Sequence, residues 1–163
     1  MKKLFLITAV LFLAFTTAQS QNIKLGVSGA LPVGDSADGY TFGAQVDFSY
    51  LFEVNEAFHV GPMASLLYYS GDEIETPIGT FDIEDALFLP IGGSARFSLE
   101  EFFFGADLGY GIGLSPDGND GGFFYRPKVG YSFGTVGVIL SYSGVSVDGG
   151  TFSSVNGGVE FSF

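Results

Sequence analysis

Residues 154 to 163 alternate between an apolar and a polar series, and this two-residue period restricts the fold more than any other feature of the chain. The apolar series consists of Val155, Val159, Phe161 and Phe163. The polar series consists of Ser154, Asn156, Gly158, Glu160 and Ser162. Because successive side chains of a β-strand point to opposite sides, the pattern predicts a strand with one apolar and one polar face.

Every basic residue after position 20 falls on the small, polar side of such an alternating segment. These residues are Lys24, Arg96, Arg126 and Lys128. A face in contact with water usually carries many bulky polar side chains, whereas this face is mostly Gly and Ser with single charges between them. We therefore expect the polar face to line a narrow interior and the apolar face to contact lipid.

Residues 1 to 20 have the pattern of a secretory signal peptide. Two lysines precede an apolar run at residues 4 to 15, and the small residues that follow suit cleavage after Ala18 or Ser20. No later stretch approaches the roughly 18 apolar residues that a transmembrane helix requires. The chain has no cysteine, which excludes disulfides, thiolate metal ligands and a catalytic thiol. We expect an exported protein with a single domain at residues 21 to 163.

Acidic residues dominate the charge of the chain. Without the predicted signal peptide, eighteen acidic and four basic residues remain, a net of 14 negative charges, which makes nucleic acid a very poor partner. Eleven acidic residues are expected in loops at one end of the fold: Asp35, Asp38, Asp72, Glu73, Glu75, Asp82, Glu84, Asp85, Asp117, Asp120 and Asp148. We interpret them as a solvated surface, with weak binding of divalent cations as the alternative.

A calcium loop is the nearest match to a metal motif. Residues 117 to 121 resemble one, but Gly121 and Lys128 occupy its fifth and twelfth ligand positions, so the EF-hand pattern fails. We therefore predict no specific metal site and no cofactor.

Alternation along the chain predicts eight strands, at residues 22–32, 40–52, 58–76, 81–99, 102–114, 123–133, 135–145 and 152–163. Tight connections near residues 53–57, 100–101 and 134 alternate with longer ones, as in outer-membrane barrels. The expected fold is all-β: a closed, eight-stranded, antiparallel, up-and-down transmembrane β-barrel. An even number of strands places both termini on the short-turn, periplasmic side.

Several positions predict irregular strands. Pro62, Pro90 and Pro127 lie inside predicted strands that have no free edge, so local bulges or water contacts are expected there. The apolar parity also changes at Val145, which predicts a bulge around Gly144.

The outward faces predict two aromatic girdles around an aliphatic band. In residues 102–114 the expected outward residues are Phe102, Phe104, Ala106, Leu108, Tyr110, Ile112 and Leu114. In residues 40–52 they are Tyr40, Phe42, Ala44, Val46, Phe48, Tyr50 and Phe52.

Over residues 21 to 163 this pattern resembles the small eight-stranded outer-membrane β-barrel family, OmpA- and OmpX-like. The most specific part of the resemblance is the C-terminal run with Val159, Phe161 and Phe163, which looks like the terminal aromatic signal that the outer-membrane assembly machinery reads. The resemblance implies a monomer in the outer membrane of a Gram-negative-type bacterium, in contact with lipid and lipopolysaccharide. It implies no activity, because many unrelated barrels share this ending.

The polar faces predict a network of charges inside the barrel. By hairpin register, Lys24 lies diagonal to Asp47, Asp107 lies diagonal to Arg96 and Lys128, and closure of the barrel brings Glu160 towards Lys24. Unpaired charges in a narrow interior are costly, so we expect one paired network: Lys24, Asp47, Arg96, Asp107, Arg126, Lys128 and Glu160. We interpret it as a plug that holds the barrel together rather than as a conducting or binding site.

The single histidine raises the question of catalysis. His59 is expected to point inward near the periplasmic mouth, and lipid A deacylases built on similar barrels use a His, a Ser and an acid. No hydroxyl lies at close spacing in residues 60–62, and Ser65 and Ser98 are only small lumenal residues. We therefore predict that the protein is not an enzyme.

The alternation continues without a slip through residues 72 to 85, which predicts a hairpin that protrudes beyond the membrane and turns at residues 77–80. Its expected outward row is Ile74, Thr76, Phe81 and Ile83, and its acidic row is Glu73, Glu75, Asp82 and Glu84. Such a ribbon has unpaired backbone edges that a partner strand can join, so we predict the interaction surface here.

The sequence leaves three functions to compare. The preferred one is a non-enzymatic outer-membrane barrel with a plugged lumen and acidic outer loops, in a structural, adhesive or envelope-protective role. The alternative is a narrow channel for ions or small solutes. A secreted lipocalin-like binding barrel fits less well, because its apolar faces should point inward.

Overall fold

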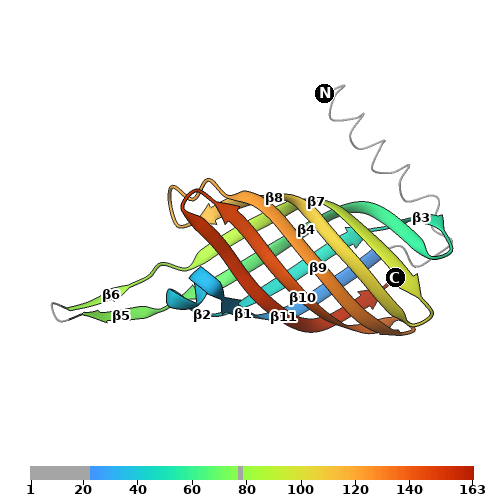
Figure 1. The fold of residues 1–163 in the computed structure, drawn as a ribbon, viewed down its shortest axis with the longest axis horizontal. Helices are drawn as coiled ribbons and strands as arrows, with labels where there is room; N and C mark the ends of the chain where they lie inside the picture. The colour runs from blue at the N-terminus through green and yellow to red at the C-terminus, as the bar shows by residue number, and fades with distance from the viewer. Residues whose placement is uncertain (1–22, 77–78) are drawn as a thin grey trace, which may run out of the picture.

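The computed structural model describes residues 23–76 and 79–163, and its long strands form a closed antiparallel barrel (Figure 1). The eight strands of the barrel wall are β1 (Ile23–Val33), β2 (Tyr40–Tyr50), β4 (Phe58–Gly71), β7 (Ala86–Leu99), β8 (Phe102–Ser115), β9 (Gly122–Phe133), β10 (Val136–Val147) and β11 (Gly150–Ser162). Each pairs with the next along the chain, and β11 closes the ring by pairing with β1 from Lys24↔Ser162 to Val33↔Ser153. The predicted up-and-down topology is confirmed.

Three short strands and one 3-10 helix extend this wall. β3 (Phe52–Asn55) continues the line of β2 and pairs with β4. β5 (Glu73–Thr76) and β6 (Gly79–Asp82) pair with each other in a separate two-stranded sheet, and η1 (Gly34–Asp38) lies between β1 and β2. The strands predicted at 58–76 and 81–99 are therefore divided, because the backbone leaves the barrel ladder after Gly71 and rejoins it at Ala86.

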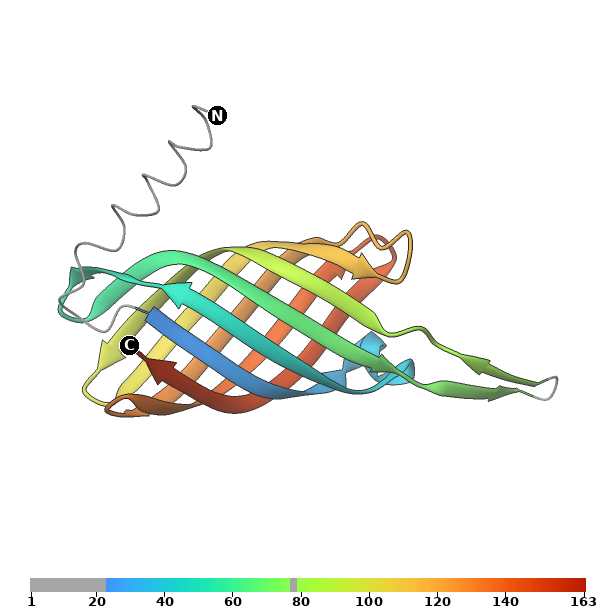
Figure 2. The same ribbon diagram turned by 180° about the vertical axis from the view of Figure 1, so that it is seen from behind.

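The two ends of the barrel differ. One end, here named the turn end, holds the short connections β7–β8 and β9–β10, the start of β1 and the C-terminus (Figure 2). The opposite end, here named the loop end, holds η1, the β5–β6 hairpin, the β8–β9 connection and the β10–β11 turn. The segments with the eleven acidic residues all lie at the loop end.

Side chains alternate between the outside and the interior along each strand, as the two-residue period requires. In β8, outward residues between Phe102 and Leu114 are exposed, whereas Phe103 and Asp107 on the other face are buried. Large apolar side chains on all eight strands are exposed in the same way and form a belt around the barrel. Within the described ranges, no helix is long and apolar enough to cross a membrane.

The three prolines inside the strands do not change the strand register. Pro62, Pro90 and Pro127 pair with Gly93, Gly111 and Ala106, and the ladder keeps its register through each of them. The predicted bulges at these prolines are therefore wrong.

The bulge predicted around Gly144 is also wrong. The pairs Ser143↔Ser154, Gly144↔Ser153 and Val145↔Phe152 follow one register. Val145 faces the interior and is fully buried. The apolar residues change from the outward to the inward positions at Val145 because the interior of the barrel is itself apolar there.

A true bulge lies at the start of β2. The register shifts between Tyr40, which pairs with Gly71, and Phe42, which pairs with Ser70. Tyr40 consequently packs against the buried core at the loop end instead of joining the outward row predicted for residues 40–52.

Candidate functional site

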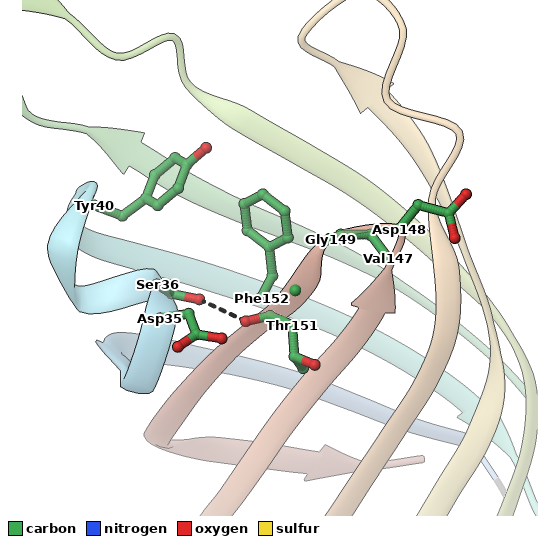
Figure 3. A pocket seen from close by; sticks show the side chains of 9 residues that line it. Asp35, Ser36, Tyr40, Val147, Asp148, Gly149, Thr151 and Phe152 are labelled. Carbon is green, nitrogen blue, oxygen red and sulfur yellow. Dashed lines mark hydrogen bonds between the residues drawn. The ribbon is translucent and has the colours of Figure 1, made fainter.

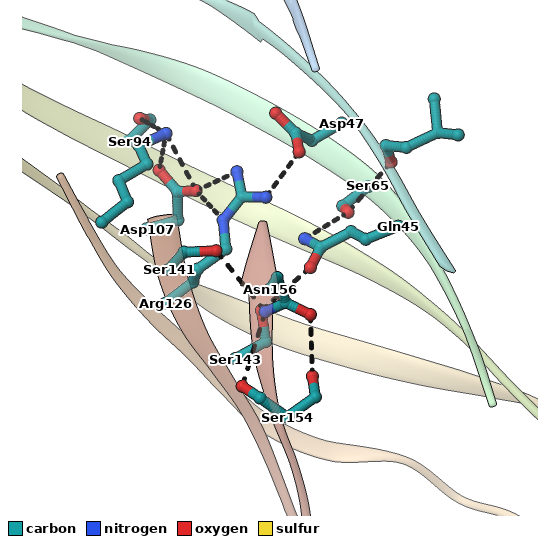
Figure 4. A network of polar contacts seen from close by, with 12 residues as sticks. Gln45, Asp47, Ser65, Ser94, Asp107, Arg126, Ser141, Ser143, Ser154 and Asn156 are labelled. Carbon is teal, nitrogen blue, oxygen red and sulfur yellow. Dashed lines mark hydrogen bonds and ion pairs between the residues drawn. The ribbon is translucent and has the colours of Figure 1, made fainter. Parts of the chain in front are cut away.

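A layer of four charged side chains fills the middle of the barrel (Figure 4). Arg126 Nε donates to Asp107 Oδ2 at 2.7 Å, and Arg126 Nη1 donates to Asp47 Oδ1 at 2.5 Å. Lys128 Nζ lies 2.9 Å from Asp107 Oδ1. All four side chains are buried, and Asp107 is fully so. Two carboxylates and two cations therefore form a neutral layer, which is the condition for holding charges out of water at moderate cost.

A second ion pair crosses the lumen nearer the turn end. Arg96 Nη2 lies 2.6 Å from Glu160 Oε1, and its guanidinium stands 3.4 Å from the centre of the Phe103 ring. Lys24 Nζ donates to Ser162 Oγ at 2.8 Å. The strand registers confirm the predicted diagonal placements of Lys24 with Asp47 and of Asp107 with Arg96 and Lys128. The ion pairs inferred from two of these placements are wrong, because Arg96 bonds Glu160 rather than Asp107, and Asp47 bonds Arg126 rather than Lys24.

The reason for these errors is the position of the partners around the ring. β9 and β2, which supply Arg126 and Asp47, lie on opposite sides of the eight-stranded wall, and so do β7 and β11, which supply Arg96 and Glu160. An eight-stranded barrel is narrow enough for side chains to meet across it. Hairpin register identifies only neighbouring strands, so it finds Asp107 with Lys128 but misses both cross-lumen pairs.

A neutral polar layer lies between the charged layer and the loop end. Gln45 donates to Ser65 Oγ and accepts from Ser143 Oγ, both at 2.9 Å. Asn156 donates to Ser143 Oγ at 2.8 Å and accepts from Ser154 Oγ at 3.0 Å. Sequence reasoning missed this layer because isolated Ser, Asn and Gln residues on a strand carry no charge signal, although their parity places them inside.

An apolar plug closes the loop end of the lumen. Its fully buried members are Leu67, Tyr69, Ala86, Phe88, Phe124 and Val145. Tyr69 connects it to the polar layer through a 2.9 Å hydrogen bond between its hydroxyl and Ser154 Oγ. Charges, amides and rings therefore fill the lumen in successive layers.

His59 and Ser65 are the residues that the question of catalysis singled out, and the absence of an enzymatic activity stays a prediction. His59 lies beside Glu53 and Arg96 in the strand ladders, and its buried Nδ1 has no hydrogen-bond partner among the residues that the structure describes. The Ser65 hydroxyl already donates to the carbonyl of Val46. Over residues 23–76 and 79–163, no group of three His, Asp or Glu side chains is placed to hold a metal ion. The weak divalent-cation binding considered for the outer loops stays a prediction.

Two adjoining cavities open at the loop end, and Figure 3 shows the first of them. The first, about 260 Å³, lies between η1 and the β10–β11 turn, and the second, about 270 Å³, lies beneath the β8–β9 connection. Both are lined by Tyr40, Val147, Asp148 and Phe152. Sequence analysis did not find these cavities, because their walls come from three separate loops.

The β5–β6 hairpin projects from the same end (Figure 1). Its ladder runs from Glu73↔Asp82 to Thr76↔Gly79. Asp85 anchors its base: Oδ1 accepts from the Gly71 amide at 3.0 Å and Oδ2 accepts from the Tyr68 hydroxyl at 2.7 Å. The turn at residues 77–78, and the side-chain rows predicted for residues 73 to 81, lie outside the described part of the chain.

Two of the residues predicted as an assembly signal lie on the closing strand, and the third, Phe163, follows its last residue. Val159 and Phe161 belong to the outward row of β11, and Phe163 at the C-terminus is 64% exposed. Their role in assembly stays a prediction.

No family model and no curated protein matches the chain. Two solved structures of the Yersinia pestis outer membrane protein Ail resemble it. The structure of Ail in a phospholipid bilayer nanodisc gives a TM-score of 0.54 at 15% identity, covering 86% of this chain and 99% of Ail. The crystal structure of Ail, the attachment invasion locus protein, gives 0.55 at 14% identity, covering 86% and 96%.

At this level of identity the likeness shows the fold: a closed, eight-stranded antiparallel barrel that an outer membrane protein also has. The KdgM porin gives a TM-score of only 0.36 at 15% identity, covering 86% of this chain and 99% of the porin. That score supports no conclusion about this chain.

Proposed function

We propose that the protein is a non-enzymatic integral β-barrel of the outer membrane of a Gram-negative-type bacterium, of the small OmpA- and OmpX-like kind, with a structural, adhesive or envelope-protective role. The belt of exposed apolar side chains around a charged interior carries the proposal. In water this orientation would expose far more contiguous apolar surface than soluble proteins carry. It is the reverse of what a lipocalin-like binder needs.

Membrane fractionation with gel mobility before and after boiling tests this location. The full chain should be recovered with the outer membrane and should migrate anomalously until it is boiled. Recovery as a soluble periplasmic or secreted protein would refute the proposal.

The turn end would face the periplasm, with both termini, and the loop end would face outward. In this orientation the C-terminal aromatic residues are available to the assembly machinery, and the loop end meets lipopolysaccharide and the surroundings. A monomer suffices, because β11 and β1 pair with each other and leave no open edge in the barrel wall.

The adhesive role is assigned to the β5–β6 hairpin. Among the residues that the structure describes, each of its strands pairs only with the other, so each has one backbone edge available for strand addition. The name of Ail as an attachment invasion locus protein supports an adhesive role for a barrel of this fold.

Replacement of residues 72 to 85 by a short Gly-Ser turn tests the hairpin. The barrel should keep its heat-modifiable mobility, while attachment of expressing bacteria to a cultured cell layer should be lost. The matched control keeps the backbone and removes charge, Glu73→Gln with Glu75→Gln, and should still attach if the strand edges bind. Unchanged attachment after the replacement would contradict the assignment.

A narrow channel is the alternative function. The layered filling of the lumen speaks against it, because among the described residues the charges of the central layer pair with one another and the apolar plug closes the loop end. Single-channel recording in planar bilayers distinguishes a channel from a plugged barrel, since regular conductance steps from the folded barrel would favour the channel.

A further inference from the structure

The two cavities at the loop end form one cup with an aromatic floor. Tyr40 and Phe152 stand with ring centres 5.4 Å apart, and both line both cavities. Below them, Phe88 meets Phe152 at 4.8 Å and Tyr69 meets Tyr40 at 5.9 Å. The floor is therefore held in place by the buried plug and does not depend on loop conformation alone.

The rim of the cup is acidic and uncompensated. Asp35 and Asp148 line the first cavity and lie on either side of Phe152 in Figure 3. Asp117 and Asp120 line the second cavity together with Asp148. None of these four carboxylates has an ion-pair partner in the described ranges, where the ion pairs join side chains inside the lumen.

The combination selects one class of ligand. Aromatic faces attract cations through the ring quadrupole, most effectively weakly hydrated organic cations. A small metal ion gains from the carboxylates but little from the rings, because it holds its water shell. A neutral apolar ligand would leave the carboxylates without a counter-charge.

We propose that this cup binds an organic cation, a guanidinium or alkylammonium group, on an aromatic floor formed by Tyr40 and Phe152 and under a rim formed by Asp35, Asp117, Asp120 and Asp148. Each cavity is slightly smaller than the roughly 300 Å³ lower limit of sites for drug-sized ligands, so one side-chain-sized group fits in each. The cation comes either from a free small molecule or from an Arg or Lys side chain of a peptide. This site is separate from the hairpin and holds whether or not the hairpin mediates attachment.

Calorimetric titration of the refolded, detergent-bound barrel tests the proposal with two probes of the same shape. N-acetyl-arginine methylamide should bind, and N-acetyl-citrulline methylamide, which lacks the charge, should bind at least about tenfold more weakly. A blocked pentapeptide with one Arg between glycines identifies the source: tighter binding than the small probe indicates a peptide, and equal binding indicates a free cation. Either result requires the cup.

Three variants locate the site. Asp35→Asn with Asp148→Asn should weaken binding of the arginine probe about fivefold or more, whereas Glu84→Gln, an exposed acid at the same end outside the cup, should leave it unchanged. Phe152→Leu should weaken it about threefold or more, with heat-modifiable mobility as the check of folding. Equal binding of the two small probes, or equal loss in the Glu84 control and the Asp pair, would overturn the proposal.

Discussion

Removal of the Asp107 carboxylate is the most direct test of the charged layer. Asp107 is fully buried and contacts both Arg126 and Lys128. With Asp47 the layer holds two negative and two positive charges, so Asp107→Ala leaves one net positive charge out of water. Arg126 keeps Asp47 as a partner, whereas Lys128 keeps only a 3.4 Å contact with Ser94 Oγ.

The size of the effect follows from this charge balance. Breaking a buried ion pair by removing one partner costs about 3–5 kcal/mol. The double change Asp107→Asn with Lys128→Met restores a neutral layer, because Arg126 and Asp47 remain paired. Its cost should be nearer that of a buried hydrogen-bonding group left without its partner, about 2 kcal/mol.

Urea unfolding of the barrel in lipid vesicles, followed by gel mobility, measures both changes. With a slope of roughly 2 kcal/mol per molar urea, Asp107→Ala should lower the midpoint by on the order of 2 M. Asp117→Ala, an exposed acid at the loop end, is the control and should change stability by about 0.5 kcal/mol or less. An unmoved midpoint for Asp107→Ala, or a double variant no more stable than the single one, would show that the layer does not stabilise the barrel as argued.

Two further predictions concern the ends of the barrel. Deletion of Phe163 should lower the amount of folded protein in the outer membrane, because it removes the aromatic residue that follows the closing strand. Phe133→Ala, at an equally exposed rim position, should not lower it. Immunoblots of boiled and unboiled membranes measure the folded protein, and equal amounts in the deletion variant and the unchanged chain would contradict the role in assembly. Asp85→Ala should speed amide exchange of Gly71, because its acceptor is lost. Hydrogen bonds from the Gly71 amide and, to a smaller extent, the Tyr68 hydroxyl hold the pKa of Asp85 below its usual range. Protection of the Gly71 amide from exchange should therefore be complete above the usual carboxylate range and be lost only as the pH falls through the lowered pKa. Loss of this protection already near neutral pH would refute the prediction.

The strands and their two faces could be predicted from the sequence, because a two-residue period encodes both. The predicted starts and ends of β1 and β10 differ from the observed ones by one or two residues, whereas the strands predicted at 58–76 and 81–99 extend five residues beyond the barrel ladder at Gly71 and Ala86. What the period cannot encode is contact across the lumen, which depends on the tilt and stagger of strands four places apart in the ring. The Arg126–Asp47 and Arg96–Glu160 pairs therefore needed the structure, whereas Asp107 with Lys128 on adjacent strands did not.

The loop end shows a second limit of sequence reasoning. Tyr40, Val145 and Val147 are apolar, and the sequence rule that apolar means outward misplaced Tyr40 and produced a bulge that does not exist at Gly144. The unbroken parity from Gly137 through Ile139, Ser141 and Ser143 to Val145 was the signal that could have corrected it. The cup was missed for a different reason, because its loops have no periodic constraint.

The distribution of polar and apolar layers has a physical explanation in the membrane that we propose. A one-residue slip of a strand exchanges its two faces. In the charged layer, such a slip would turn Arg126 or Lys128 towards lipid, at about 2–4 kcal/mol for each basic side chain near the middle of the bilayer. If the interior were apolar at this depth, the slip would cost little free energy, because either face of the strand could contact lipid. Near the loop end this penalty falls towards zero, so the interior can be apolar, and Phe88, Phe124 and Val145 fill it without loss of register.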